Sequence, residues 1–249
     1  MPQKPIFIAG TKHAETNINL AKHLKGASAG YTLPRNPQNY FIINYGRFDN
    51  YGNLNKRLIF NKLEALKILE RKGVSTPKII ITRHPENISN YEYPLLARKE
   101  HHARGSDAIF LKNRKCLLKR LRKVRRRDFF IRYIEKEKEF RVHILGNEVA
   151  NISQKIKDDD ETTHHPHIWS LARGWVCIDY NGRYNRPLSE LGKQAVKAIG
   201  YDFGAVDIIL GKDGKFYVLE INSAPRLCIE RRRKYTKYFR DKEIQHRRR

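Results

Sequence analysis

Three oxygen-bearing side chains interrupt two apolar runs near the C-terminal end of the 249-residue chain. The runs are FGAVDIIL, residues 203–210, with Asp207, and KFYVLEINSAP, residues 215–225, with Glu220 and Asn222. The Gly-Lys-Asp-Gly turn between them predicts an antiparallel β-hairpin. Side chains alternate faces along a strand, so Glu220 and Asn222 share a face, and the hairpin is expected to bring Asp207 opposite them.

Two carboxylates and an amide on one face suit a hard cation such as Mg²⁺. This ion prefers oxygen ligands and shares its coordination shell with water and nucleotide phosphates. The alternative is a hairpin whose polar face meets solvent. The apolar neighbours of Asp207, residues 205–206 and 208–209, favour a strand buried on both faces, where an unpaired carboxylate is unfavourable. The hairpin therefore predicts a site for Mg²⁺ and a nucleotide.

At these residues the chain resembles the ATP-grasp superfamily, in which an Asp on one strand and a Glu-x-Asn on the next hold Mg²⁺ against ATP. The resemblance is to the carboxylate–amine ligase type and to ATP-grasp proteins of bacteriophage genomes, and it extends over residues 56–228. It implies an α+β fold in which two α/β lobes sandwich the nucleotide. The implied division is an N-terminal α/β lobe (1–55), a central nucleotide-binding lobe (56–134), a Mg-binding C-terminal lobe (135–228) and a basic tail (229–249).

The resemblance assigns phosphate contacts to the segment at 93–113, which predicts a strand, a loop and a second strand. Arg98 ends the strand PLLAR where relatives place a phosphate-binding lysine, and the adjacent Lys99 is the alternative. The loop that follows would close over the phosphates with Gly105 and Ser106. Because this loop has few glycines, Arg104 would supplement its backbone N–H groups. An ordinary basic hairpin loop remains the competing interpretation.

The resemblance places the adenine edge against backbone groups near Tyr133 and Ile134, at the connection between the two nucleotide-binding lobes. Glu135 or Glu137 would then hold the ribose hydroxyls.

Two cations of the C-terminal lobe are predicted to act in catalysis. Arg141 follows the acidic-x-Arg pattern of the family, and its planar fork suits a phosphate or a carboxylate. Lys155 occupies a position where relatives place another phosphate-contacting base. The competing interpretation of Arg141 is a surface arginine on a strand.

Elements with clear sequence signals must position these residues. Strands are predicted at 5–10 and 41–46, a helix at 14–26, and two strands joined by a Gly146-Asn147 turn within 129–157. A further helix at 188–200 leads into the metal hairpin. The segment 61–78 predicts a helix with Asn61 at its N-cap and Gly73 at its end, and Lys62 in its first turn is a weaker phosphate-contact candidate.

The charge balance is strongly basic, with 51 lysines and arginines against 26 aspartates and glutamates, for a formal net charge of +25. Such an excess attracts polyanions over about 8 Å at physiological salt. The run at 112–127 predicts an amphipathic helix with a basic face towards solvent. This face suits nucleic acid or an acidic protein, and a basic helix that binds nothing is the alternative. The tail from 229 mixes Tyr235, Tyr238 and Phe239 with cations, which suits either base stacking or a docked terminal helix.

Composition also argues against several classes. No apolar run approaches the length of a membrane span and the N-terminus lacks the layout of a signal peptide, so a cytoplasmic protein is expected. Cys116, Cys177 and Cys228 are widely spaced, which indicates neither a disulfide framework nor a zinc site. The histidine-rich tract within 158–185 is interpreted as a mobile loop near the active site, and the segment 170–175 departs from the pattern of relatives.

The leading hypothesis is an ATP-dependent ligase that joins a carboxylate to an amine or thiol through an acylphosphate, with small-molecule or peptide substrates. The protein would supply positioning and charge, so no protein nucleophile is required. One alternative is an ATP-grasp kinase of a polyanionic substrate. The other is a nucleic-acid-binding or structural protein on a degenerate ATP-grasp scaffold.

Overall fold

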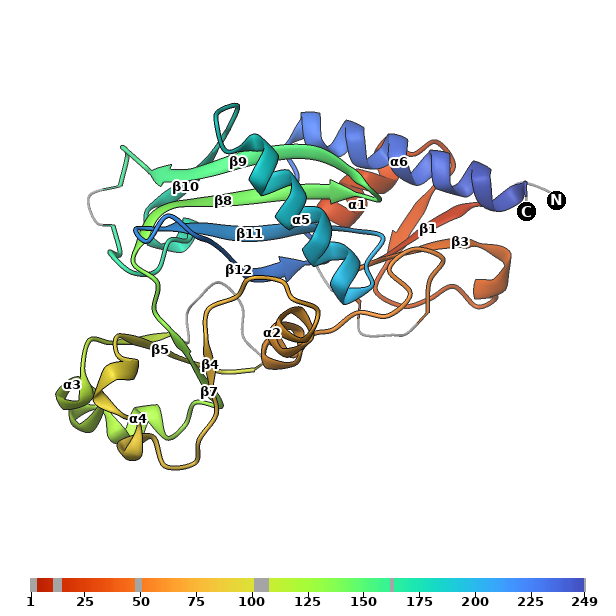
Figure 1. Cartoon of the computed structure of the whole chain (residues 1–249). Coiled ribbons are helices and arrows are strands. Elements are labelled where there is room, and N and C mark those ends of the chain that lie inside the picture. Colours follow the sequence, from red (N-terminus) through yellow and green to blue (C-terminus); the bar gives the residue numbers. More distant parts are fainter. Residues whose placement is uncertain (1–3, 11–14, 48–50, 101–107, 162–163, 249) are drawn as a thin grey trace.

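The computed structural model describes residues 4–10, 15–47, 51–100, 108–161 and 164–248 of the chain, with the side chain of Leu171 left out. The described residues form three sheets, with orders β2-β1-β3, β4-β7-β5-β6 and β10-β9-β8-β11-β12. In Figure 1 the second sheet and its short helices form a small lobe that projects away from the rest of the molecule. Helix α6 runs along the opposite side, from the five-stranded sheet to the N-terminal lobe.

The N-terminal lobe is a small parallel sheet covered by one helix. Its elements are β1 (Ile6–Gly10), α1 (Glu15–His23), β2 (Ser28–Gly30) and β3 (Phe41–Tyr45), with a short 3-10 helix at Pro37–Asn39. The predicted strands at 5–10 and 41–46 and the predicted helix are confirmed. β2 was not predicted because its three residues, Ser-Ala-Gly, carry no apolar pattern.

The central lobe comprises helix α2, a four-stranded antiparallel sheet and two short helices. These are α2 (Lys62–Arg71), β4 (Ile79–Ile80), β5 (Leu95–Arg98), β6 (Ile109–Leu111), α3 (Arg114–Lys119), α4 (Leu121–Val124) and β7 (Phe129–Arg132), with 3-10 helices at Pro85–Asn87 and Asn90–Glu92. The Asn61 side chain accepts from the N–H of Glu64, which confirms the predicted N-cap. Gly73 follows the helix with φ +72°, where a side chain would be strained.

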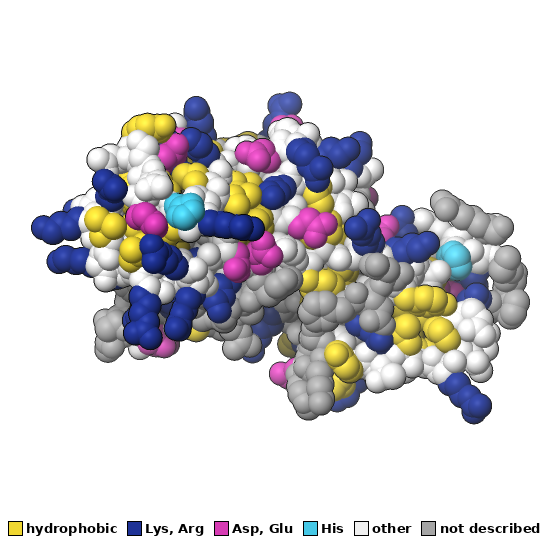
Figure 2. All heavy atoms as spheres, turned by 90° about the horizontal axis from the view of Figure 1, so that it is seen from below, with side chains coloured by type: hydrophobic (Ala, Val, Ile, Leu, Met, Phe, Trp, Pro, Cys, Tyr) yellow, Lys and Arg dark blue, Asp and Glu magenta, His cyan; other side chains and the backbone are white. Residues whose placement is uncertain are grey.

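The prediction of one continuous helix at 112–127 is wrong, because the helix breaks at Arg120. Leu117 and Val124, one from each short helix, both pack into the small core of this lobe, whereas Leu118 stays 48% exposed. Most cations of the run are exposed. The view from below in Figure 2 shows lysine and arginine side chains standing out from the end of the molecule that holds this lobe.

The C-terminal lobe is a five-stranded antiparallel sheet with one helix across one face. Its elements are β8 (Lys136–Leu145), β9 (Glu148–Lys157), β10 (Trp175–Asp179), α5 (Asn185–Ile199), β11 (Phe203–Gly211) and β12 (Phe216–Asn222), with a 3-10 helix at Leu171–Arg173. The predicted β11–β12 hairpin and the turn between β8 and β9 are confirmed. The helix begins at Asn185, three residues before its predicted start.

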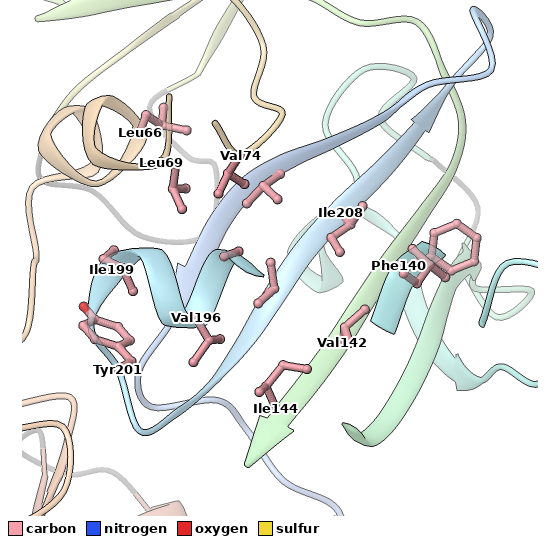
Figure 3. Close-up of a cluster of buried hydrophobic side chains, with 14 of the residues drawn as sticks. Leu66, Leu69, Val74, Phe140, Val142, Ile144, Val196, Ile199, Tyr201 and Ile208 are labelled. Atoms are coloured by element: carbon pink, nitrogen blue, oxygen red, sulfur yellow. The ribbon is translucent and has the colours of Figure 1, made fainter. Parts of the chain in front are cut away.

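Alternation along β11 divides its side chains between two faces. Val206 and Ile208 join the main core beneath α5. Figure 3 shows Ile208 in this core with Phe140 and Val142 of β8. Helix α2 adds Leu66 and Leu69 to the same core, so this helix of the central lobe packs on the C-terminal lobe. The opposite face of β11 carries Phe203 and then Asp207. One face of the sheet therefore packs in the hydrophobic core, and the other face can carry a binding site.

Helix α6 (Ile229–Arg247) covers part of that second face and ties it to the N-terminal lobe. Tyr235 and Phe239 are fully buried, and Phe239 packs on Phe203 with ring centroids 5.0 Å apart. Tyr238 is half-buried and donates to the carbonyl of Asp202. Of the two interpretations of the tail, the docked helix is confirmed. Base stacking by Tyr235 and Phe239 is excluded by their burial.

No helix among the residues that the structure describes is long and apolar enough to cross a membrane.

Replacing Phe239 tests the connection that α6 makes. Phe239→Ala removes a fully buried ring and leaves a cavity, so the free energy of unfolding should fall by about 3–5 kcal/mol. Ile229→Ala on the same helix, at a side chain 54% exposed, should change it by less than about 0.5 kcal/mol. Urea unfolding followed by circular dichroism measures both, and equal losses would contradict the assigned packing.

Candidate active site on the open face of the five-stranded sheet

The β11–β12 hairpin brings the predicted metal ligands together. Asp207 lies opposite Glu220 in the strand register. A bulge between Asp207 and Ile208 leaves Leu219 as an extra residue on β12, and such bulges re-aim side chains beside active sites. The side-chain amide of Asn222 donates to Oε1 of Glu220 at 3.4 Å. The sheet thus presents two carboxylates and an amide at one place, as the sequence predicted.

Arg141 of β8 lies directly across the sheet from Asp207 and pairs with it through two hydrogen bonds. Nε donates to Oδ1 at 2.7 Å and Nη2 donates to Oδ2 at 2.8 Å. Lys155 of β9 places its ammonium 3.9 Å from the same Oδ2. Burial alone would raise the pKa of Asp207, but these two cations outweigh it and lower the pKa to about 2. Asp207 is therefore ionised at neutral pH.

Glu139 holds a second set of charges one step along the same face of β8. Its carboxylate is 3% exposed, accepts from Lys136 at 2.8 Å, and also pairs with Lys155. Burial lowers the pKa of Lys136, and Glu139 opposes that shift. Burial likewise acts to lower the pKa of Lys155, yet Glu139 and Asp207 raise it above its usual value. Glu139 thus favours the charged form of both lysines and keeps Lys155 directed at the site.

Glu220 receives its cations from the central lobe. Lys62, in the first turn of α2, lies 3.2 Å from Oε2, and Arg98, at the end of β5, lies 3.9 Å from the same atom. Burial would raise the pKa of Glu220, whereas Lys62 and Arg98 lower it. The Arg98 pair joins the four-stranded sheet to the C-terminal lobe, and the Lys62 pair adds to the packing of α2 on that lobe. They also place Lys62, the weaker candidate from sequence, beside the predicted metal ligands.

A cavity of about 30 Å³ lies next to the charged face, between the two sheets. Its lining is mostly apolar: Pro77, Leu96, Ile131, Arg132, Tyr133, Ile134, Lys136, His167, Ile209 and Leu219. The two residues predicted for the adenine edge therefore line a cavity beside the carboxylates. The N–H of Tyr133 already donates to the carbonyl of Pro94 at 2.8 Å, so this group is committed to holding the connection in place.

Other predicted residues are placed less centrally. Lys99 is half-buried beside Arg98, and Glu137 is exposed. Glu135 is 66% exposed and pairs with Lys212 on the turn of the β11–β12 hairpin. The predicted loop residues Gly105 and Ser106, with Arg104, lie outside the residues that the structure describes.

Sequence reasoning missed Lys136 and Glu139. The run Glu-Lys-Glu-Lys-Glu at 135–139 suggests a solvated strand. The signal that would have found Glu139 is strand periodicity, because a residue two positions before Arg141 shares its face. His143, two positions after Arg141, is also fully buried. Burial lowers its pKa to about 3, with Arg231 and Arg141 adding to the effect.

Two solved ligase structures share this architecture. A complex of the ATP-grasp ligase PsnB with a minimal precursor, Mg and ADP matches with a TM-score of 0.71 and 11% identity, covering 96% of this chain and 97% of that one. D-alanine–D-alanine ligase from Bacillus anthracis complexed with ATP matches with a TM-score of 0.67 and 14% identity, covering 98% and 97%. These similarities define the fold as ATP-grasp.

The sequence carries the assignment further. Residues 60–245 match the RimK-like ATP-grasp domain, and the chain belongs to this family. A probable alpha-L-glutamate ligase of Vibrio parahaemolyticus is 23% identical over 177 residues, which cover 67% of this chain and 56% of the relative. The chain thus spans little more than half the length of the curated relatives it matches.

Glu139→Gln tests whether this carboxylate neutralises the buried lysines. The variant keeps the shape but leaves Lys136 without its ionic partner and Lys155 with a weaker one, so the free energy of unfolding should fall by about 3–5 kcal/mol. Glu135→Gln removes an exposed partner of a lysine from the same strand region and should cost at most about 1 kcal/mol. Thermal and urea unfolding at neutral pH compare them. A Glu139→Gln protein as stable as wild type would contradict the role assigned to Glu139.

Proposed function

We propose that the chain binds ATP with Mg²⁺ between its central and C-terminal lobes and uses it to join a carboxylate to an amine. The observation that carries this proposal is the pairing of Asp207 with Glu220, with Asn222 beside them, inside a ring of cations from both lobes. Membership of the RimK-like ATP-grasp family supports it. The ligase names of the relatives and structural neighbours point the same way.

The donor set fits Mg²⁺. Asp207 and Glu220 are ionised, and both belong with Asn222 to the oxygen ligands that this ion prefers. These three residues would hold the ion, which would supply positive charge to neutralise part of the charge on the phosphates. These three side chains are too few to fill the coordination shell of Mg²⁺. This is expected for an ion that shares its shell with water and a nucleotide.

The cations already gathered at the carboxylates would take the phosphates. Lys62 and Arg98 approach from the central lobe, and Arg141 and Lys155 from the sheet. Phosphate oxygens would share these four cations with Asp207 and Glu220. None of the four cationic side chains would have to move far to reach them. Charges fixed in advance in this way stabilise a transferring phosphoryl group without reorganisation. Arg141 and Lys155 are the residues proposed to act in catalysis.

The proposed reaction has two steps. An oxygen of the substrate carboxylate attacks the γ-phosphorus, and the bond between the γ-phosphorus and the bridging β-phosphate oxygen breaks. ADP departs, and the substrate is now an acylphosphate. The amine nitrogen then attacks the acyl carbon, the carbon–oxygen bond to phosphate breaks, and the amine loses a proton as the amide forms. Two substrate groups carry the chemistry, and the protein holds and neutralises them.

An anionic substrate fits the charge of the chain. A PsnB structure holds a precursor peptide with AMPPNP, which makes a carboxylate within a peptide one candidate class, beside a free amino acid. The exposed cations of α3 and α4 lie on the surface of the central lobe, and we propose that they attract an acidic part of the substrate or an acidic partner. Burial of the α6 aromatic rings argues against nucleic acid at the C-terminal helix.

Two substitutions test the proposed metal ligands. Asp207→Asn and Glu220→Gln should each reduce ADP release at least about 100-fold, because the charge that holds Mg²⁺ against the phosphates is lost. Asp213→Asn, on the exposed turn of the same hairpin, is the matched control and should keep wild-type turnover. The assay measures ADP release with MgATP and a panel of amino acids and acidic peptides. Wild-type rates in either site variant would overturn the assignment.

A further inference from the structure

A histidine of the C-terminal lobe lies flat on a phenylalanine of the central lobe. The ring of His167, in the segment between β9 and β10, stacks on Phe110 of β6 with centroids 3.6 Å apart and planes 20° from parallel. His167 also meets Tyr133 edge-on, at 5.2 Å and 89°, and its Nδ1 lies 3.2 Å from the tyrosine hydroxyl. This contact joins the central and C-terminal lobes beside the connection between them.

The position of His167 matters because the same ring lines the cavity proposed for adenine. That cavity has a volume of about 30 Å³, which is room for one or two water molecules. Pockets that hold ligands of nucleotide size are roughly tenfold larger or more. Adenine therefore does not fit the cavity as it stands, and at least one lining side chain has to move before the base can enter.

The environment of His167 resembles one that would suit a purine. An imidazole is the five-membered ring of a purine, and here it has an aromatic face beneath it and a hydroxyl at one ring nitrogen. Burial is the larger cause that lowers the pKa of His167, and the positive charge of nearby Lys136 adds to it. The ring is therefore neutral at neutral pH. A neutral base can replace a neutral ring on Phe110 without leaving a buried charge unpaired.

The segment that carries His167 also contacts the charged face. The carbonyl of Trp169 accepts from Lys155 at 3.0 Å, and the ammonium of Lys136 lies 4.6 Å from the centre of a Trp169 ring. Trp169 stacks on Trp175 at 4.0 Å with planes 10° apart. A displacement of His167 would therefore disturb both a tryptophan stack and the two lysines that Glu139 holds.

We propose that His167 occupies the site of the nucleotide base, and that adenine binds by displacing it from Phe110 and moving residues 164–169. This inference rests on the proposed use of ATP and adds to it a base-competing residue. Occupation by His167 lowers the fraction of molecules ready to bind the base, and so weakens apparent nucleotide affinity. The same movement would free Lys155 from Trp169 as the phosphates arrive.

The chain contains two tryptophans, Trp169 and Trp175, so its intrinsic fluorescence reports directly on this segment. The full-length protein is titrated with Mg²⁺ and either a non-hydrolysable ATP analogue or tripolyphosphate, which lacks the base. The expected result is a saturable change in tryptophan emission with the analogue and none with tripolyphosphate. The same change with both ligands, or none with the analogue although calorimetry shows that it binds, would overturn the inference while ATP binding stands.

His167→Ala gives a second measurement. Without the competing ring, the analogue should bind about twofold to tenfold tighter, from the roughly 0.5–1.5 kcal/mol of an aromatic pair. The emission of the free variant should already be shifted towards that of nucleotide-bound wild type. His84→Ala, at a side chain 73% exposed on the central lobe, should leave both unchanged. Unchanged or weaker binding by His167→Ala would overturn the inference, and no binding by either protein would overturn it together with the use of ATP.

Discussion

The buried carboxylate of Asp207 sets the arrangement of everything around it. An ionised carboxylate at the centre of a sheet is strongly unfavourable unless cations and hydrogen bonds satisfy it. Arg141, one strand away, provides a two-pronged partner at 2.7 and 2.8 Å, and Lys155, two strands away, adds a second positive charge. Glu139 then becomes necessary, because Lys155 and Lys136 are themselves buried. The site is a chain of charges in which each member requires the next.

Strand alternation turns this requirement into a functional layout. Along the open face of β11, Phe203 belongs to the core beneath α6, Asp207 to the charged site, and Ile209 to the wall of the apolar cavity. One strand therefore links the docking of the N-terminal lobe to the site proposed for phosphates and then to the site proposed for the base. The other face of the same strand is ordinary core under α5. The stability of the lobe and its chemistry are thus carried by alternate residues of one strand.

Sequence was sufficient where short-range pattern decides the outcome. The β11–β12 hairpin, the Asn61 cap and the grouping of Asp207 with Glu220 all follow from turn chemistry and alternation, and each is seen in the structure. Features set by tertiary packing were not predictable. The helix at 112–127 is interrupted at Arg120 although its apolar residues keep helical spacing, so the local pattern does not encode the break. The stack of His167 on Phe110 joins segments far apart in the chain, so no local pattern encodes it.

The carboxylate pair of Asp207 and Glu220 is proposed to bind a metal–nucleotide complex. The most direct test of this proposal is the equilibrium affinity for a non-hydrolysable ATP analogue, measured by calorimetry at fixed ionic strength with and without Mg²⁺, for wild type and Glu220→Gln. Mg²⁺ should tighten binding to wild type at least about tenfold, or roughly 1.4 kcal/mol, and this gain should be lost in the variant. Equal affinity with and without Mg²⁺ in wild type would contradict the proposal.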